Sequence, residues 1–576
     1  MKVLLINPPL GIFNSIYTSI PLLKGQLVGN NIDTDILDFN VEFLREITSP
    51  RYLKETKKYL KKIYKNPSIL NKDVSQEYHL SEAQILHQRK IIEKYLISNT
   101  KLIDIFMNKK ESFFDQFLKA TFDNTLKDSN KYDKYVKIFH SLVYFSFLPY
   151  YPEENYTKLC NGNPVCTVKN PLYNYTYKDI TDKCSNRKRN IYINFFEKKV
   201  KELNLKKYDV IGITIPFEQN LYPALTLSKI LKEKTKAKII IGGIVPTTTI
   251  DSFISHPDMF GKYFDYILSG DGETSIVEYI KSFKNQLPIS EVSGLVYKTD
   301  DVVKRNDIKP IKNINEIHPP NYDGINFNNY TNKNDISLEF SKGCYWHKCT
   351  YCYNNLWKKY YVRTPEKAVD IIQLLNQKYD TKFFNIFDDA LNINFAEKFA
   401  DELIKRNLNI KYTCFLRVEE ELDYELLKKL KESGLKGIFI GIESGSERIL
   451  QLMNKGINLN TAERILKDCH KIGIETHIGL MYRFPTETKE DTMKTIDFLN
   501  KTKKYITNQC DTIFHLTKSS AMLTEENIEK FQLTNITQPE EFSDDVKYDA
   551  PGISKDEVCK ILEEHKIKYV FHTKWF

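Results

Sequence analysis

The stretch Gly343-Cys344-Tyr345-Trp346-His347-Lys348-Cys349-Thr350-Tyr351-Cys352 places three cysteines within nine residues, directly after the strand-like run 335–340. A chain that leaves a strand into such a loop can direct three thiolates at one point. A structural zinc site normally closes with four protein ligands, and His347 is the only nearby candidate for a fourth. Three thiolates therefore favour a 4Fe–4S cluster with one open iron, held by Cys344, Cys349 and Cys352. A zinc knuckle and three unrelated buried thiols are the alternative interpretations.

The loop resembles that of the radical S-adenosylmethionine (SAM) enzymes, specifically those with an N-terminal cobalamin-binding-type domain. The usual loop of this family is Cys-x3-Cys-x2-Cys with an aromatic residue before the last cysteine. Tyr351 fills the aromatic position, whereas four residues separate Cys344 from Cys349 instead of three. The resemblance implies a cluster that is reduced, cleaves SAM by one electron, and yields a 5′-deoxyadenosyl radical that abstracts hydrogen from the substrate.

The composition indicates a globular chain of two to four domains. It has 576 residues, of which 41% are hydrophobic and 28% charged. The formal net charge of +9 comes mainly from Lys, and no basic stripe interleaved with aromatic residues stands out. We therefore expect a solvated Lys-rich surface and no nucleic-acid partner.

The sequence pattern predicts neither export nor membrane insertion. The opening segment 1–9 is too short for a secretory signal and ends in a turn. The apolar run 139–151 is interrupted and too short to span a membrane. The ten cysteines are widely scattered outside the central loop, which favours a reducing compartment. A cytoplasmic protein without a membrane partner is the expectation.

Alternating strands and helices predict a doubly wound, Rossmann-like domain from residues 1–40 plus 201–300. Residues 1–40 read as strand, Pro-Pro turn, helix and strand, and the pattern resumes with apolar strands at 208–215, 238–243 and 263–269. Ligands of such sheets bind at the carboxyl ends of the strands.

In this order the segments resemble the cobalamin-binding domain of the family. The matching parts are the early Asn-Pro-Pro, the Ile-Gly-Ile-Thr strand, the Gly-Gly pair and the Gly-x-Gly-Glu turn. No Asp-x-His-x-x-Gly segment is present to supply a lower axial His, so the lower face of the cobalamin would be unligated. The resemblance implies cobalamin contacts at Asn7, Pro8, Thr214, Gly242, Gly243, Gly270, Gly272 and Glu273.

Residues 41–200 form an insertion that we expect to be mostly helical and to cap the active site. Cys160, Cys166 and Cys184 lie in or just after its Tyr- and Pro-rich last third, where a separate metal site is less expected than inert thiols. A short β pair is expected at 292–297 and 302–303, and residues 301–334, with Pro319-Pro320, read as a linker.

From residue 335 the strand–helix alternation is regular. Strands are expected at 335–340, 382–387, 411–416, 436–441, 473–479 and 511–516, with helices between them. Six such units fit the partial (β/α)6 barrel of the radical SAM family, over residues 335–520. Residues 521–576 read as a polar tail with one helix after Ser554 and no assigned chemistry.

Polar residues just after these strands are the candidate SAM ligands. Asp388 and Asp389 suit the amino group of SAM, and Arg417 suits its carboxylate. The segment around Glu443 and Ser444 resembles the family's Gly-x-Glu-Ser motif and could bond the ribose or amino group, with Tyr351 beside the cluster. The fifth strand departs from the family pattern, since both glycines expected nearest Pro485 are missing, and no adenine contact is assigned there.

The sequence therefore predicts a radical SAM enzyme acting on an unidentified small molecule or peptide, with cobalamin-dependent methyl transfer as the leading reaction. A cobalamin-free cyclase, epimerase or rearrangement enzyme is the alternative, in which Cys414 or Cys510 could return a hydrogen atom. A non-enzymatic electron-transfer or sensor protein would not need the Asp pair or Glu443-Ser444. The resemblance also implies an electron donor such as flavodoxin or ferredoxin.

Overall fold

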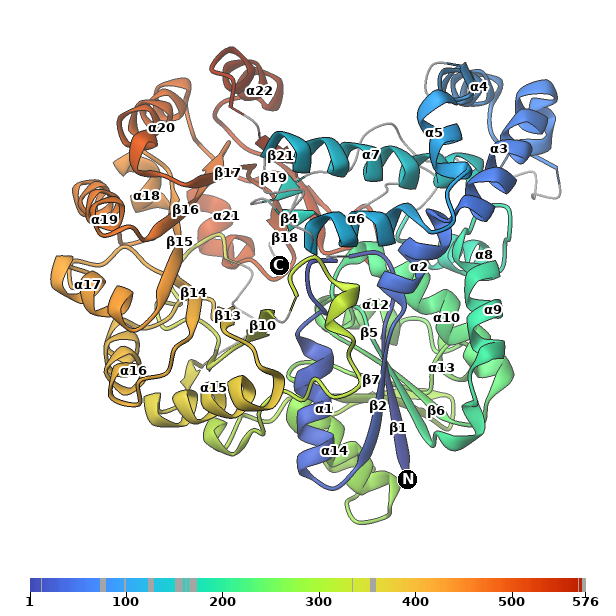
Figure 1. The fold of residues 1–576 in the computed structure, drawn as a ribbon, viewed down its shortest axis with the longest axis horizontal. Helices are drawn as coiled ribbons and strands as arrows, with labels where there is room; N and C mark the ends of the chain where they lie inside the picture. Colours follow the sequence, from blue (N-terminus) through green and yellow to red (C-terminus); the bar gives the residue numbers. More distant parts are fainter. Residues whose placement is uncertain are drawn as a thin grey trace.

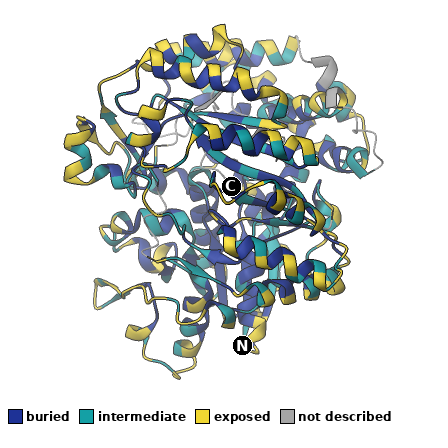
Figure 2. Cartoon of the chain, turned by 90° about the vertical axis from the view of Figure 1, so that its left-hand side faces the viewer, coloured by how far each residue is buried: buried dark blue, intermediate teal, exposed yellow. Residues whose placement is uncertain are grey.

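The computed structural model describes residues 1–11, 13–72, 79–97, 100–122, 129–150, 159–160, 163–164, 174–333, 335–352, 359–567 and 569–571. Two seven-stranded sheets dominate it, one in each half of the chain (Figure 1). Most strands of both sheets are largely buried, and exposed residues lie mainly on the outer helices and loops (Figure 2).

The first sheet has the strand order β2-β1-β5-β6-β7-β8-β9. Its first five strands are parallel: β1 (Lys2–Asn7), β2 (Asp33–Asp38), β5 (Val210–Thr214), β6 (Lys238–Gly242) and β7 (Tyr266–Leu268). Helices α1 (Ser19–Gly29) and α14 (Gly272–Phe283) pack together, and α10 (Leu221–Lys234) packs with α9 (Tyr192–Glu202). The remaining helices between β6 and β7 are short: α11 (Ile244–Thr248), α12 (Ile250–Ile254) and α13 (Met259–Lys262). The strand-to-helix alternation explains why the sheet is parallel, as predicted.

Two antiparallel strands extend this sheet, and the second of them lies beyond the expected boundary at residue 300. They are β8 (Leu295–Thr299) and β9 (Val302–Arg305), which pair with each other, while β8 also pairs with β7. β9 therefore lies in the segment 301–334 that reads as a linker, because a two-residue turn after Thr299 folds it back along β8.

Helices occupy most of the described part of the insertion. They are α2 (Phe39–Ile47), α3 (Pro50–Lys65), α4 (Glu82–Ile97), α5 (Thr100–Met107), α6 (Phe113–Phe122), α7 (Ser129–Phe147), α8 (Tyr177–Lys183) and α9; two-residue strands β3 (Leu159–Cys160) and β4 (Asn163–Pro164) pair with each other. Phe13, which follows β1, packs against Phe114, Phe117 and Phe139 and so ties these helices to the first sheet.

Of the three cysteines of this region, Cys184 is buried, and burial raises the pKa of its thiol to about 12. A thiol in that environment is unreactive. The side chains of Cys160 and Cys166 lie outside the described residues.

The second sheet is parallel throughout and has the strand order β10-β13-β14-β15-β16-β17-β21. Its strands are β10 (Asp335–Leu338), β13 (Phe383–Ile386), β14 (Lys411–Leu416), β15 (Leu435–Glu443), β16 (Glu475–Tyr482), β17 (Asn508–Ile513) and β21 (Tyr569–Phe571). The helices between them are α15 (Pro365–Tyr379), α16 (Ile393–Lys405), α17 (Tyr424–Glu432), α18 (Glu447–Leu452), α19 (Leu459–Ile472) and α20 (Lys489–Thr502). These helices form the outer layer at the left of Figure 1.

Burial alternates along the strands of this sheet. In β14, Tyr412, Cys414 and Leu416 are buried, whereas Thr413 and Phe415 are only half-buried. Because side chains alternate across a strand, the buried residues form one face of the sheet and the half-buried residues form the other. The α/β architecture with parallel sheets is thus confirmed.

The segment 521–576 is more than a polar tail with one helix. It holds α21 (Glu525–Lys530), β19 (Thr534–Thr537), β20 (Asp545–Asp549) and α22 (Lys555–Glu564), and β21 is the last strand of the second sheet. β20 lies between β19 and β18 (Leu516–Thr517) in a three-stranded antiparallel sheet. A small apolar core that includes Phe484, Phe514 and Phe531 fixes this region. These apolar residues are spaced too irregularly to indicate a strand or helix from the sequence.

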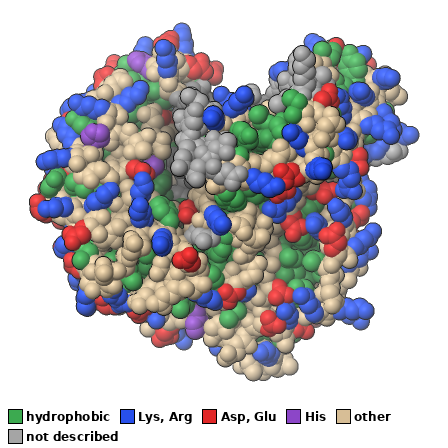
Figure 3. All heavy atoms as spheres, viewed as in Figure 1, with side chains coloured by type: hydrophobic (Ala, Val, Ile, Leu, Met, Phe, Trp, Pro, Cys, Tyr) green, Lys and Arg blue, Asp and Glu red, His purple; other side chains and the backbone are tan. Residues whose placement is uncertain are grey.

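On the face shown in Figure 3, Lys and Arg side chains are spread among Asp and Glu side chains over both halves. In the portion that the structure describes, no helix combines the length and apolarity that crossing a membrane would require.

Candidate functional site

The cysteine loop leaves and re-enters the fold at a single neck. β11 (Ser341–Lys342) pairs antiparallel with β12 (Tyr361–Val362), so the segments that flank the loop lie side by side. Asp388, 1% exposed, accepts hydrogen bonds from Phe340 N through both carboxylate oxygens, each at 3.1 Å, and from the Ser341 hydroxyl. Burial raises the pKa of Asp388 to about 7, although these hydrogen bonds oppose the rise. Asp388 is therefore engaged in holding the neck.

The loop itself docks on the turn 452–456 that follows α18. Trp346 Nε1 donates to Asn454 O at 2.9 Å, and Thr350 N donates to Met453 O at 3.0 Å. Gly456, with φ +65°, lies so close to the Trp346 ring that an added Cβ would be 2.1 Å from ring atom Cζ2. The Arg417 guanidinium stacks on the same indole at 4.3 Å and donates to Lys455 O at 2.6 Å. Trp346 thus lies between Arg417 and the turn.

An ion pair lies beside the loop. Lys455 Nζ is 2.9 Å from Glu443 Oε1 and 3.2 Å from the Tyr351 hydroxyl, and the Lys455 and Glu443 side chains are 11% and 15% exposed. Burial lowers the pKa of Lys455, but Glu443 and Cys349 raise it by more, so the Lys455 ammonium stays cationic. Glu443 holds φ +67°, a strained conformation for a residue with a side chain, which places its carboxylate over Gly441.

The three thiols of the loop are half-buried, and none forms a disulfide. Burial raises the pKa of Cys349, whereas the cations Lys455 and Arg417 oppose that rise. Among the described residues, no three or more His, Cys, Asp or Glu side chains are arranged to hold a metal ion. The donor type fits an iron–sulfur cluster, but the ligand set is not preassembled, so the assignment of Cys344, Cys349 and Cys352 stays a prediction.

The candidate SAM ligands divide into two groups. Tyr351, Arg417 and Glu443 lie together beside the cysteine loop, as the contacts above show. Ser444 is fully buried instead, with its hydroxyl 3.2 Å from that of Thr495. Asp388 faces the loop neck, whereas its neighbour Asp389 is exposed. The Asp pair therefore does not present two carboxylates to one ligand.

The candidate cobalamin residues gather at one edge of the first sheet, at or just after the carboxyl ends of four parallel strands: Asn7 and Pro8 after β1, Thr214 in β5, Gly242 and Gly243 at β6, and Gly270, Gly272 and Glu273 after β7. Protein atoms fill the space beside the glycines: an added Cβ would be 2.8 Å from Ile215 O at Gly243 and 2.9 Å from Leu23 Cδ2 at Gly272. Two buried oxygens in this region, Oδ1 of Asn14 and Oδ1 of Asn220, have no hydrogen-bond partner among the residues that the structure describes.

Sequence reasoning missed three basic residues of this region. Lys455 lies one short helix after the Gly-x-Glu-Ser segment, and Lys342 directly precedes the cysteine loop, so adjacency to a motif was the available signal for both. Arg363 is 5% exposed, and its Nη1 makes no hydrogen bond to any described part of the chain. No local pattern identifies Arg363, because its charged neighbours come from distant segments.

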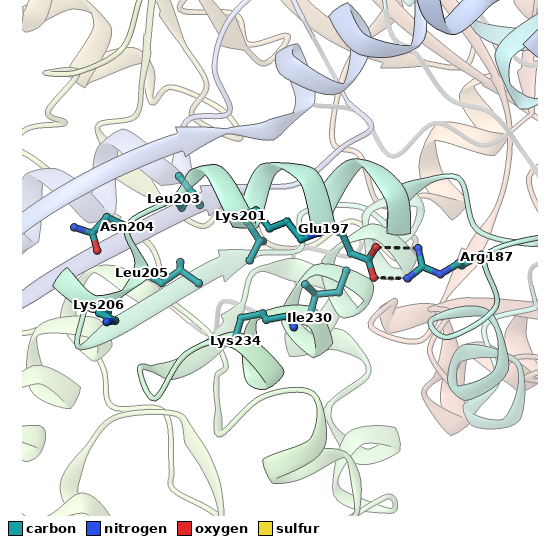
Figure 4. Close-up of a pocket in the computed structure, with 10 residues that line it drawn as sticks. Arg187, Glu197, Lys201, Leu203, Asn204, Leu205, Lys206, Ile230 and Lys234 are labelled. Carbon is teal, nitrogen blue, oxygen red and sulfur yellow. Dashed lines mark hydrogen bonds and ion pairs between the residues drawn. The ribbon is translucent and has the colours of Figure 1, made fainter. Parts of the chain in front are cut away.

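A separate cavity of about 660 Å³ lies between the end of α9 and α10 (Figure 4). Arg187 at its rim pairs with Glu197, Nη1 to Oε2 at 2.9 Å and Nη2 to Oε1 at 2.5 Å. None of the candidate ligands lines this cavity, and we assign it no part in the chemistry.

Comparison with protein families confirms the resemblance of the second half. The family model described as the radical SAM superfamily matches residues 338–499. This range begins at the end of β10, contains the cysteine loop and ends within α20.

Two curated relatives match about half of this chain. A protein named as an uncharacterized methyltransferase from Pyrococcus horikoshii is 28% identical over 312 residues, which cover 52% of this chain and 65% of the relative. The anaerobic magnesium-protoporphyrin IX monomethyl ester cyclase of Synechocystis is 22% identical over 301 residues, which cover 50% of this chain and 58% of the relative. The chain thus spans less than two thirds of the length of either relative.

A solved structure resembles nearly the whole chain. The radical SAM methyltransferase TsrM from Kitasatospora setae, with cobalamin and a [4Fe-4S] cluster bound, superposes with a TM-score of 0.50 over 92% of this chain and 74% of that chain. The sequences are 13% identical, so this likeness establishes the fold alone.

Proposed function

We propose that this chain is a radical SAM enzyme that cleaves SAM reductively at a 4Fe–4S cluster, because residues 338–499 match the model of the radical SAM superfamily. The leading reaction is cobalamin-dependent methyl transfer to a small molecule or peptide, and the second sheet acts as the family's partial (β/α)6 barrel. Methyl transfer is supported by the methyltransferase relative.

The observation that carries the proposal is the docked cysteine loop. Cys344, Cys349 and Cys352 would hold the cluster, which when bound supplies the electron that cleaves SAM. Arg417 and Lys455 place two positive charges beside Cys349, where they favour an anionic ligand set. The Trp346 indole, which packs on Gly456 and donates a hydrogen bond to the turn, covers this side of the loop.

SAM would bind on the interior face beside Glu443 and Lys455. Glu443 is positioned for an ammonium or ribose hydroxyl, and the cations Lys455 and Arg417 are positioned for a carboxylate. Asp389, exposed next to the neck, is the member of the Asp pair that can reach a ligand. A donor such as flavodoxin or ferredoxin would supply the electron.

Cobalamin would lie against the edge formed by β1, β5, β6 and β7. It carries several amide side chains, and the unpartnered Oδ1 atoms of Asn14 and Asn220 can accept hydrogen bonds from amides. The residues present therefore fit this group, with the glycines allowing close approach of the backbone segments around it.

The test is anaerobic reconstitution with iron and sulfide, followed by reduction in the presence of SAM. We expect about four iron atoms per chain and formation of 5′-deoxyadenosine or S-adenosylhomocysteine. The Cys344→Ala, Cys349→Ala, Cys352→Ala triple variant should lose the iron, whereas Cys184→Ala, which removes a buried thiol elsewhere, should keep it. Iron and sulfide retained by the triple variant would overturn the ligand assignment.

A cobalamin-free cyclase, epimerase or rearrangement enzyme is the second candidate, favoured by the cyclase relative. Protein expressed with cobalamin discriminates the two, because a bound corrin gives a visible spectrum that a cobalamin-free enzyme lacks. An electron-transfer or sensor protein would bind the cluster but form neither SAM-derived product.

A further inference from the structure

A buried charge group joins the first sheet to the neck of the cysteine loop. Lys342 Nζ lies 2.6 Å from Glu273 Oε1 and 3.5 Å from Asp271 Oδ1, and it also pairs with Glu339. The Lys342, Glu273 and Asp271 side chains are only 14%, 8% and 17% exposed. Asp271 directly precedes α14 and Glu273 lies in its first turn, about seventy residues earlier in the chain, so this contact connects the segment after β7 with the neck of the cysteine loop.

The charges of this group depend on one another. Three carboxylates surround one ammonium, and Arg363, which follows β12, faces Glu273, Glu339 and Asp388. Burial raises the pKa of Asp271 to about 7, whereas Lys342 lowers the pKa of Glu273 against the effect of burial. Removing one partner from a buried ion pair would leave the other charge uncompensated, at a high cost in free energy. The intact pairs therefore hold their geometry strongly.

The neck is consequently held from two sides. Asp388 binds Phe340 and Ser341 from the second sheet, and Glu273 with Asp271 binds the next residue, Lys342, from the first sheet. Gly343 and Cys344 follow Lys342 directly. No other described segment of the first sheet has a salt bridge to residues 341–352.

We propose that Glu273 and Asp271 act through Lys342 to position the cysteine loop, so that the turn after β7 sets the placement of the cluster ligands. Lys342 and Glu273 are positioning residues. Glu273 is committed to this bridge and not to cobalamin. Because Gly270 and Gly272 flank Asp271 at the candidate cobalamin edge, a ligand bound there is coupled mechanically to the cluster. This inference rests on the proposed function for its chemical meaning.

The first test uses the apoprotein and needs no cofactor. Hydrogen exchange of the amides in 341–352 and 361–363 is compared for the wild type, Glu273→Gln, Lys342→Met and Lys342→Arg. We expect exchange at least about tenfold faster in Glu273→Gln and Lys342→Met, with Lys342→Arg close to the wild type. The control is Asp301→Asn, which removes an exposed ion pair to Lys298 within the first sheet.

The second test uses the reconstituted protein. Glu273→Gln should bind iron like the wild type but show an altered EPR spectrum of the reduced cluster and about a tenfold loss in kcat for SAM cleavage, with KM changed less. Wild-type exchange and an unchanged spectrum in Glu273→Gln would overturn the inference while leaving the function intact. A wild type that binds no iron would instead overturn the proposed function. If Lys342→Met does not fold, the comparison of Glu273→Gln with Lys342→Arg still tests the inference.

Discussion

At the scale of single residues, the acidic side chains near the site serve different purposes despite similar motif positions. Asp388 and Asp389 are adjacent in the loop that follows β13. Asp388 is buried against the loop neck and Asp389 is exposed, a division that adjacency in the sequence does not reveal. Glu487, in the divergent fifth-strand motif, is 1% exposed and accepts hydrogen bonds from Phe484 N and the Thr492 hydroxyl.

Glu487 should make the stability of the protein depend on pH. Burial raises the pKa of its carboxyl from 4.5 to about 7, so between these values the folded state binds more protons than the unfolded state. Stability should therefore fall as pH rises from about 4.5 to about 7, by up to about 3 kcal/mol from this group. Glu487→Gln should flatten that slope in urea unfolding measured from pH 5 to 8.

The matched control for this measurement is Glu490→Gln, an exposed position three residues further along. It should leave the slope as in the wild type. A Glu487→Gln protein with the wild-type slope would show that this carboxyl is ionised in the fold at pH 5 and above.

At the scale of elements, the turn 452–456 matters more to the site than the strand end that precedes α18. Glu443 was predicted from the strand end, and the structure adds that the turn one helix later supplies its cation and receives Trp346. The extra residue between Cys344 and Cys349 lies in the part of the loop that carries Trp346. Turn geometry of this kind depends on positive φ at Asn454 and Gly456, which spacing alone does not specify.

Gly456→Ala should therefore displace the cysteine loop. The new Cβ would clash with the Trp346 ring and adopt an unfavourable φ, so we expect a loss of unfolding free energy of about 2 kcal/mol or more. The fluorescence of Trp346 should shift toward that of an exposed indole.

The control variant Gly261→Ala separates the effect of backbone strain from the effect of a clash with the Trp346 ring. Gly261 also has positive φ, at +85°, but nothing lies within 4 Å of an added Cβ. This control should lose about 1 kcal/mol and keep the wild-type fluorescence. Equal effects of the two variants would mean that Gly456 serves only the turn.

At the scale of the whole molecule, the C-terminal segment ties the two halves together. Phe542 is fully buried, its ring lies 4.7 Å from that of Phe253, and its N–H donates to Tyr175 O at 2.8 Å. The flanking Glu541 approaches His256 Nε2 at 3.0 Å, and Ser543 donates to Glu218 at 2.6 Å. A segment without predicted chemistry thus spans the gap between the first sheet and the second.

Phe542→Ala should weaken this connection. Loss of a buried aromatic side chain costs about 3–5 kcal/mol, and here both halves lose a contact, so the midpoint of urea unfolding should fall and a second transition should become resolved. Ile536→Ala, at a 37% exposed position of β19, is the control and should change little. An unchanged, single transition in Phe542→Ala would show that the halves are held together elsewhere.

The sequence by itself determined the elements whose signal is local. Apolar runs between helices predicted the parallel strands, and the cysteine spacing with Tyr351 predicted the family of the second half, because these depend on residues near each other in the chain. Tertiary structure alone decided what distant segments supply: β9 and β21 as sheet edges, Lys455 opposite Glu443, and Glu273 on Lys342. Charge pairing and burial bring these partners together from segments far apart in the chain, so no local sequence pattern predicts them.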